Sequence, residues 1–351
     1  MQVYPHITEA IQHPHIIDIG DQVYVAKFEC MKVYSTLTAI DHLIKKGTLK
    51  VGDTVVDSSS GIYAHALALA CHRFGLKCHI IASKTVDDSF KTQLSLLGAT
   101  YEPAPSGQSL KLDQEFRVNR IKHLLAESPN VHWMQQYHDD IHYLGYQKFA
   151  QKICHSLDLV PDDSLTLIGG VGTGCSTGGT AHYLRGQGIN LNVQGIQPFG
   201  SVTFGAEFVD DPEAVIAGIG SAIPFNNVRH DIYQDIHWMS FNTCLSGSLA
   251  LMKEHAIFAG LSSGAGLTVA RWLRNTGHKS PILLIAPDTG HRYLEAVFQR
   301  PHLAEPIDSL EPKKLSHLSE LSMPWSVIPW PQLETHFTPK HYKNNRLAKV
   351  G

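Results

Sequence analysis

The sequence predicts an α/β fold in which helices cover parallel sheets. Short apolar runs typical of strands alternate with longer amphipathic segments typical of helices over most of the chain. Glycine closes several of the helical segments, at Gly47, Gly75 and Gly98, where a helix C-terminus favours it. With 351 residues, 43% of them hydrophobic and 17% charged, the chain is long enough for two domains with sizeable cores.

The expected elements follow one another in order along the chain. Strands are predicted at residues 22–28, 53–57, 77–83, 131–137, 164–170, 191–197 and 281–286. Helices are predicted at residues 36–47, 62–75, 90–98, 109–128, 146–157, 180–188 and 266–277. From about Pro306 this rhythm stops and the chain becomes rich in Pro, His and Trp. We expect an arm packed on the body or on a partner subunit there, with a frayed tail over about the last ten residues as the alternative.

Composition excludes several classes of function. A net charge of −3 and a pI near 6.7 give no electrostatic basis for binding nucleic acid or acidic membranes. No apolar run approaches the roughly 18 residues of a membrane span, and the N-terminus lacks the pattern of a secretory signal. The six cysteines form no C-x-x-C pair, so we expect reduced thiols and a cytoplasmic protein.

Histidine is abundant, with 22 residues, but it shows no metal-ligand spacing elsewhere in the chain. The segment "YHDDIH" at residues 137–142 is the one place where two imidazoles and two carboxylates gather. His138 and His142 would need a helix there to bind one metal ion. We expect no metal site and interpret both histidines as solvated or ligand-facing loop residues.

A dense glycine loop, "GGVGTGCSTGG" at residues 169–179, follows a predicted strand and precedes a predicted helix. Backbone N–H groups and the positive end of the helix dipole point to the same place in such a loop, which favours a phosphate. The spacing lacks the G-x-G-x-x-G of dinucleotide-binding folds, and the next strand ends in Gln197 where the ribose-binding acid belongs. No lysine is present for a P-loop. The alternative is a loop that only turns the chain.

Small polar loops recur where other predicted strands end. Residues 58–61, "SSSG", offer hydroxyls and N–H groups at a helix start, which suits a carboxylate, although serines are also good helix caps. Gln135 and Gln136 follow another strand, and small residues fill positions 218–222, 260–265 and 287–290. Because ligands bind outside the carboxyl ends of parallel strands, these loops predict a phosphate-bearing cofactor beside an amino-acid substrate.

In order and spacing, five of these segments resemble the cysteine synthase and cystathionine β-synthase branch of fold type II pyridoxal-phosphate enzymes. They are "SSSGIYAHALA", "GVGTGCSTGG", "AGIGSAIP", "GLSSGA" and "APDTGHRYL", and the match spans about residues 20 to 300. The resemblance implies the two-domain, three-layer parallel-sheet fold of the tryptophan synthase β type. It also implies pyridoxal 5′-phosphate as the cofactor, its phosphate held by Gly172, Thr173, Gly174, Cys175 and Ser176.

An enzyme of this kind needs a lysine for the Schiff base. The family places it at the start of the helix after the first small-domain strand, and Lys32 falls at that position. Lys27 is the competitor, but it lies inside a predicted strand. The dipole at a helix N-terminus disfavours an ammonium ion and helps to present Lys32 as a neutral amine. A solvated loop lysine is the alternative.

Two departures from the family pattern change the expected chemistry. The family's asparagine, which contacts the cofactor's phenolic oxygen, aligns with Ile62, so His65 or Tyr63 would have to supply that hydrogen bond if it is made. Cys175 replaces the fourth glycine of the phosphate loop. Thr289 keeps the hydroxyl that the family places opposite the pyridine nitrogen. A hydroxyl does not hold that nitrogen protonated, which favours β-elimination.

The resemblance implies β-replacement or β-elimination on an activated L-serine, O-acetyl- or O-phosphoserine, through a bound aminoacrylate, in a specialised biosynthetic pathway. Alternatives are a serine/threonine deaminase or racemase of the same fold, and a non-catalytic paralogue that binds a metabolite or a partner protein. The expected substrate-binding residues are Ser59, Ser60, Gly61, Tyr63, Gln135, Gln136 and Gly220. We expect a homodimer with a small mobile domain at residues 30–145, a large cofactor-binding domain at 1–29 and 146–305, and the extension at 306–351.

Overall fold

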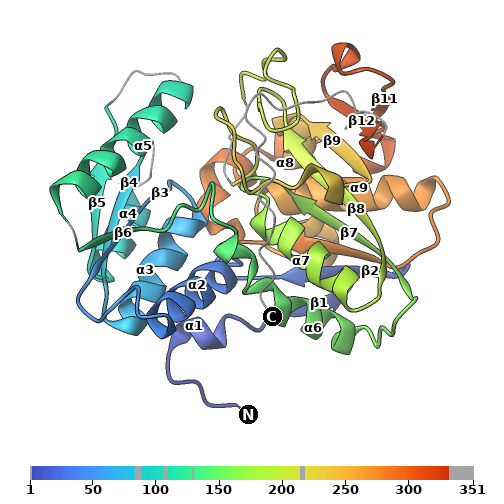
Figure 1. The fold of residues 1–351 in the computed structure, drawn as a ribbon. Helices are drawn as coiled ribbons and strands as arrows, with labels where there is room; N and C mark the ends of the chain where they lie inside the picture. Colours follow the sequence, from blue (N-terminus) through green and yellow to red (C-terminus); the bar gives the residue numbers. More distant parts are fainter. Residues whose placement is uncertain (1, 84–87, 106–109, 129, 214–217, 332–351) are drawn as a thin grey trace. The chain divides into compact units, whose positions relative to one another are not determined.

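The computed structural model describes residues 2–83, 88–105, 110–128, 130–213 and 218–331 (Figure 1). The chain forms two compact units. Unit 1 comprises Met1–His13 and Cys30–Gly145, and unit 2 comprises Pro14–Glu29 and Tyr146–Gly351. Within the described ranges no helix is long and apolar enough to cross a membrane.

Unit 1 is built on a parallel sheet in the order β5-β4-β3-β6. Its strands are β3 (Thr54–Ser58), β4 (Lys77–Ala82), β5 (Ala99–Pro103) and β6 (Val131–Trp133). Its helices are α1 (Ile7–Ala10), α2 (Val33–Lys45), α3 (Ile62–Phe74), α4 (Asp88–Leu96) and α5 (Leu110–Glu127), with a 3-10 turn η1 (Asp140–Tyr143). The face of α3 that packs against the core is rich in alanine, which lets the helix lie close to its neighbours.

Unit 2 is built on a larger mixed sheet in the order β1-β2-β10-β7-β8-β9-β12-β11. The strands are β1 (His15–Asp18), β2 (Val23–Lys27), β7 (Ser164–Gly170), β8 (Asn190–Pro198), β9 (Asp235–Met239), β10 (Ile282–Ala286), β11 (Lys313–Lys314) and β12 (Trp325–Pro329). The central strands from β2 to β9 run parallel, whereas β1 pairs antiparallel with β2 and β12 pairs antiparallel with β9.

The α-helices in the described part of unit 2 are α6 (Tyr146–Ser156), α7 (Cys175–Gly186), α8 (Phe241–His255) and α9 (Leu261–Asn275). Short helical turns complete it: η2 (His230–Ile232), η3 (Gly290–Tyr293), η4 (Leu294–Phe298), η5 (Pro301–Leu303), η6 (Ile307–Ser309) and η7 (Leu318–Glu320).

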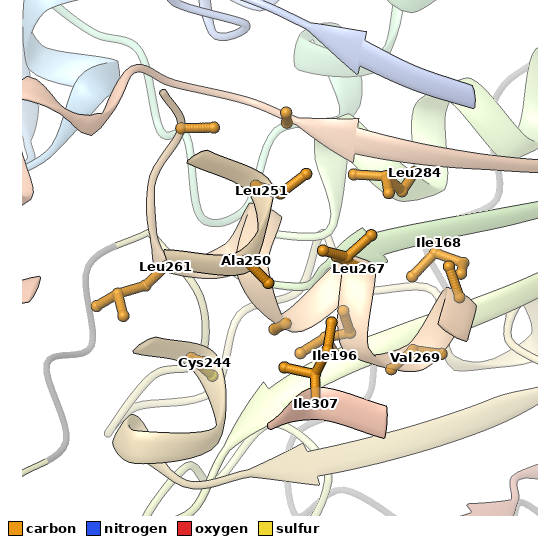
Figure 2. Close-up of a cluster of buried hydrophobic side chains, with 14 of the residues drawn as sticks. Ile168, Ile196, Cys244, Ala250, Leu251, Leu261, Leu267, Val269, Leu284 and Ile307 are labelled. Carbon is orange, nitrogen blue, oxygen red and sulfur yellow. The ribbon is translucent and has the colours of Figure 1, made fainter. Parts of the chain in front are cut away.

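One hydrophobic core cluster of unit 2 lies where α8 and α9 meet the sheet. Figure 2 shows Leu251 of α8 and Leu267 of α9 gathered with Ile168 of β7 and Leu284 of β10. The two helices approach to backbone contact, since a Cβ added at Gly247 would lie 2.0 Å from the carbonyl oxygen of Gly264. Glycine at this crossing therefore sets how closely the helices pack, and with it where the α9 N-terminus lies.

The predicted fold class, α/β with parallel sheets, is confirmed, but several elements differ. The sequence reading missed β1, β5, β9, α8 and the paired strand β12. Helix α7 begins at Cys175, inside the glycine loop, and not at residue 180. The strand expected at 131–137 ends at Trp133, and Gln135, two residues further on, adopts a φ of +52°, which lies outside the extended region of a regular strand.

The described part of the C-terminal extension packs on unit 2. Strand β12 pairs antiparallel with β9, and the buried indole of Trp325 donates to His237 Nδ1 at 3.2 Å. Residues 332–351 lie outside the described residues. The N-terminal segment groups with unit 1, because Glu9 pairs with Arg73 at 2.7 Å and the Tyr34 hydroxyl donates to the carbonyl of Gln12.

Candidate active site

The glycine loop of unit 2 leads from β7 directly into α7. Gly174 is the N-cap of α7 and adopts a φ of +80°, which favours glycine because an L side chain is strained there. A Cβ at Gly174 would lie 2.9 Å from the Cα of Val228, and one at Gly172 would lie 2.5 Å from the carbonyl oxygen of Gly218. The loop therefore brings bare backbone to a helix N-terminus, where the positive end of the helix dipole attracts an anion.

The side chains of this loop are held by local contacts. Thr177 donates from its hydroxyl to the carbonyl of Gly170 at 2.9 Å, and Cys175 is buried with its Sγ 3.8 Å from the carbonyl oxygen of Thr173. Ser176 is half-buried in the first turn of α7. On the neighbouring loop, Gly220 adopts a φ of +71° and donates to the carbonyl of Val171 at 2.8 Å.

A second cluster of unit 2 lies where α9 begins and β10 ends. Ser263 is fully buried in the first turn of α9, and its hydroxyl has no hydrogen-bond partner among the described residues. Asp288 follows β10 and accepts from the Tyr293 hydroxyl at 2.9 Å. Burial raises the pKa of Asp288 to about 6. The hydroxyl of Thr289 lies 3.2 Å from Nδ1 of His291.

The sequence predicts a loop of small residues at 260–265 but assigns no role to Ser263. A buried hydroxyl without a partner costs free energy unless a ligand or water satisfies it, so Ser263 joins the candidate residues. The only signal in the sequence is the run of small residues at 260–265, which does not distinguish Ser262 from Ser263.

In unit 1, the serine loop joins β3 to α3. The Gly61 N–H donates to Ser59 Oγ at 3.2 Å, and Ser60 Oγ accepts from the Ser83 N–H at 2.7 Å. Gly61 is the N-cap of the 13-residue helix α3, which starts at Ile62. The loop thus places hydroxyls and the first N–H groups of a helix at the carboxyl end of β3, an arrangement suited to a carboxylate.

The glutamine pair lies on the turn that follows β6. Gln136 is buried and its side-chain amide donates to the carbonyl of Ser58, beside the serine loop. Tyr137 donates to the same carbonyl at 3.0 Å. The backbone carbonyl of Gln135 accepts from both His138 and Asp139 at 2.9 Å, which supports its positive φ. The structure therefore brings the serine loop and the glutamine turn together, as parallel strands β3 and β6 are neighbours.

Lys32 is half-buried at the N-cap of α2, and its backbone carbonyl accepts from the Thr36 N–H at 3.0 Å. Lys27, by contrast, is the last residue of β2 in unit 2. Tyr63, offered as a replacement for the missing asparagine, is buried in α3 and its hydroxyl bonds to Asp57 and lies 3.5 Å from His142 Nε2. Ile62 is partly buried against the core of unit 1.

His142 is buried inside unit 1. Its Nε2 lies 2.8 Å from the carbonyl oxygen of Met134, which can only accept, so Nε2 carries the hydrogen and Nδ1 accepts from the Ser35 hydroxyl at 2.9 Å. Burial lowers the pKa of His142 to about 4, with a smaller contribution from the charge of Lys32. His142 is therefore a neutral, buried residue, so the expectation that it is solvated is wrong, whereas the alternative that it faces a ligand stays a prediction. Across the described ranges, no group of three or more His, Cys, Asp or Glu could hold a metal ion.

Comparisons with a family model and with known proteins place the chain in the same family. The family model described as "Pyridoxal-phosphate dependent enzyme" matches residues 28–288. The N-(2-amino-2-carboxyethyl)-L-glutamate synthase of Ralstonia nicotianae is 31% identical over 271 residues, covering 76% of this chain and 77% of its own. A cysteine synthase of Staphylococcus aureus is 26% identical over 268 residues, covering 74% and 81%.

Solved structures agree on the fold. The O-acetylserine dependent cystathionine β-synthase of Helicobacter pylori superposes with a TM-score of 0.72 at 22% identity, covering 84% of this chain and 98% of its own. The cysteine synthase of Entamoeba histolytica gives a TM-score of 0.74 at 19% identity, covering 88% and 97%.

The residues present fit pyridoxal phosphate. The loop around Gly172 and Gly174 has no room for a Cβ and ends at a helix N-terminus, which suits a phosphate. The buried hydroxyl of Ser263, which has no hydrogen-bond partner among the described residues, could bond to a polar atom of the cofactor. The family match and the fold agree with these groups. The chain therefore belongs to the pyridoxal-phosphate dependent enzymes, in the branch that contains the cysteine synthases.

Proposed function

We propose that this enzyme replaces the β-substituent of an activated L-serine with a nucleophile. The observation that carries the proposal is the serine loop at the N-terminus of α3, which is hydrogen-bonded to the glutamine turn through the Gln136 side chain. The chain that contains it belongs to the pyridoxal-phosphate dependent enzymes. That arrangement binds the α-carboxylate of an amino acid through Ser59, Ser60 and Gly61, with Gln135 and Gln136 beside it.

Lys32 is the residue that we assign to cofactor attachment and to proton transfer. Its side chain begins at a helix N-terminus, where the dipole favours the neutral amine, and the Nζ of such an amine can take the α-proton of the substrate. When bound, pyridoxal phosphate acts as the electron sink that makes this proton acidic. Gly172, Thr173, Gly174, Cys175 and Ser176 would hold its phosphate, and Thr289 and Ser263 are hydroxyls available to its ring.

The replacement itself breaks the bond between Cβ and the ester oxygen and forms a bond between Cβ and the nucleophile. The leaving group departs as acetate or phosphate, and the nucleophile loses one proton. Two relatives that are 31% and 30% identical carry the name N-(2-amino-2-carboxyethyl)-L-glutamate synthase, which describes a nitrogen nucleophile. We therefore place the amine of L-glutamate first among nucleophiles, ahead of sulfide and thiols, which implies a specialised biosynthetic pathway.

The test is to incubate the purified holoenzyme with O-acetyl-L-serine or O-phospho-L-serine, with and without L-glutamate, and to follow products by mass spectrometry. We expect a glutamate adduct that requires one ester and the cofactor, with little pyruvate, and no product from Lys32→Ala. Rapid release of pyruvate from plain serine, or of 2-oxobutanoate from threonine, would establish a deaminase, and loss of α-carbon configuration a racemase. Silence with every ester and nucleophile would favour the non-catalytic paralogue.

We also propose a cytoplasmic homodimer. All six cysteines are free thiols, five of them buried, which suits a reducing compartment. Homo-oligomers are most often two-fold dimers. Light scattering after size-exclusion chromatography should give twice the 38.8 kDa of one chain, and a monomer mass would refute the dimer.

A further inference from the structure

One buried carboxylate of unit 1 accepts hydrogen bonds from residues of both proposed substrate-binding loops. Asp57, which is 1% exposed, lies near the carboxyl end of β3. Its Oδ1 accepts from the Ser58 N–H at 2.8 Å and from Trp133 Nε1 at 3.0 Å, and its Oδ2 accepts from the Gln136 N–H at 3.0 Å. The Tyr63 hydroxyl supplies a further hydrogen bond. A buried carboxylate needs such donors, because it has lost its hydration.

Three of these four donors lie in three different segments. Ser58 opens the serine loop, Tyr63 lies in the first turn of α3, and Gln136 lies on the turn after β6. The three segments carry every substrate-binding residue that we assign to unit 1. Asp57 itself is buried in the protein interior, so any effect on the substrate must pass through the residues that it contacts.

The glutamine turn depends on such support. Gln135 adopts a φ of +52°, which is unfavourable for a residue with a side chain and persists only where the surrounding structure imposes it. The next N–H, that of Gln136, is anchored on Asp57, while the Gln136 side chain bonds to the Ser58 carbonyl. The Asp57 carboxylate thus holds the glutamine turn and the serine loop in a fixed position relative to each other.

We propose that Asp57 is a positioning residue that holds the serine loop and the glutamine turn in the geometry that binds the substrate α-carboxylate. This inference rests on the proposed function, since it assigns these loops to an amino-acid substrate. It assigns Asp57 no contact with the substrate or with the reacting atoms.

The test compares two carboxamide variants at opposite ends of the same strand. Asp57→Asn keeps the shape but replaces one acceptor oxygen with an NH2 group, which must face a backbone or indole N–H. Asp53→Asn is the matched control, since Asp53 precedes β3 and accepts from the Lys50 N–H at 2.8 Å. Trp133→Phe, which removes only the indole donor, is a milder second variant that preserves the carboxylate.

Three quantities are measured for each holoenzyme: cofactor content per chain, the dissociation constant of L-alanine, which has no β-leaving group, by calorimetry, and KM and kcat for the activated serine. For Asp57→Asn we expect the cofactor content to be unchanged. The dissociation constant of L-alanine and the KM should both rise about tenfold or more, with a much smaller change in kcat. Trp133→Phe should weaken both in the same direction by a smaller factor, and Asp53→Asn should match the wild type.

The inference is overturned if Asp57→Asn binds L-alanine and the ester as the wild type does. It is equally overturned if Asp57→Asn loses its fold while Trp133→Phe retains wild-type binding, because the carboxylate would then be structural only. A wild-type protein that binds cofactor but neither L-alanine nor any ester rejects the proposed function, and this inference with it.

Discussion

Gly174 offers a direct test of the phosphate loop, through the pair of variants Gly174→Asn and Gly174→Asp. Asn and Asp have nearly the same size, and both tolerate the left-handed region better than other side chains. They differ in one negative charge at the N-terminus of α7. The difference between them therefore isolates the electrostatic contribution of the loop from its steric contribution.

The structure sets the magnitude of both contributions. A side chain at φ +80° costs about 1 kcal/mol of stability. A Cβ would lie 2.9 Å from Val228 Cα and 3.0 Å from the Asn227 carbonyl oxygen, which forces the backbone to shift at a further cost of about 1–3 kcal/mol. Both variants should lose this stability. A charge about 4 Å from a phosphate adds a repulsion of about 4 kcal/mol at an effective dielectric constant of 20, so Asp should bind the cofactor at least about 100-fold more weakly than Asn.

The assay is equilibrium dialysis of pyridoxal phosphate against each variant, with the free energy of unfolding measured in denaturant on the apoprotein. Gly186→Ala, at the other end of α7, is the control, since no atom lies within 4 Å of an added Cβ there and it should behave as the wild type. Equal cofactor affinity in the Asn and Asp variants, with both folded, would refute the assignment of this loop to a phosphate.

Three further predictions concern unit 1. Borohydride reduction of the holoenzyme followed by peptide mapping should place the pyridoxyl group on Lys32, and a label on Lys27 would contradict the assignment. Burial lowers the pKa of His142 to about 4 in the folded protein. As the pH falls below about 6.5, His142 is therefore protonated in the unfolded chain while it stays neutral in the folded one. His142 should therefore cost the wild type about 2 kcal/mol of stability between pH 7 and pH 5, and this part of the loss should be absent in His142→Gln denaturation curves. Arg117 and Asp113 form a buried ion pair at 2.8 Å, so Arg117→Leu should destabilise the fold by about 3–5 kcal/mol, and adding Asp113→Leu should recover much of it. Additive losses in the double variant would mean that the pair is not coupled.

Most of the local structure could be predicted, and the failures have identifiable causes. Strand β12 was missed because the surrounding composition is rich in Pro and Trp, and its pairing with β9 joins segments about 90 residues apart in the chain. Helix α7 was predicted to start late because glycine has a low helix propensity, yet packing places Gly178 and Gly179 inside the helix, where a Cβ at Gly179 would clash with Tyr146.

The sequence by itself determined the fold class, the family and the positions of the loops that carry the proposed chemistry. Strand periodicity, helix-closing glycines and loops such as residues 172–176 are local patterns, and local patterns survive without knowledge of tertiary contacts. Only the tertiary structure decided which polar groups are buried and what they touch. The sequence alone predicts Asp57 to be an ordinary strand residue, and His142 to be a solvated or ligand-facing loop residue. Their roles depend on donors such as Trp133, which is 76 residues from Asp57, and Ser35, which is 107 residues from His142, because burial and hydrogen-bond partners are properties of the packed interior.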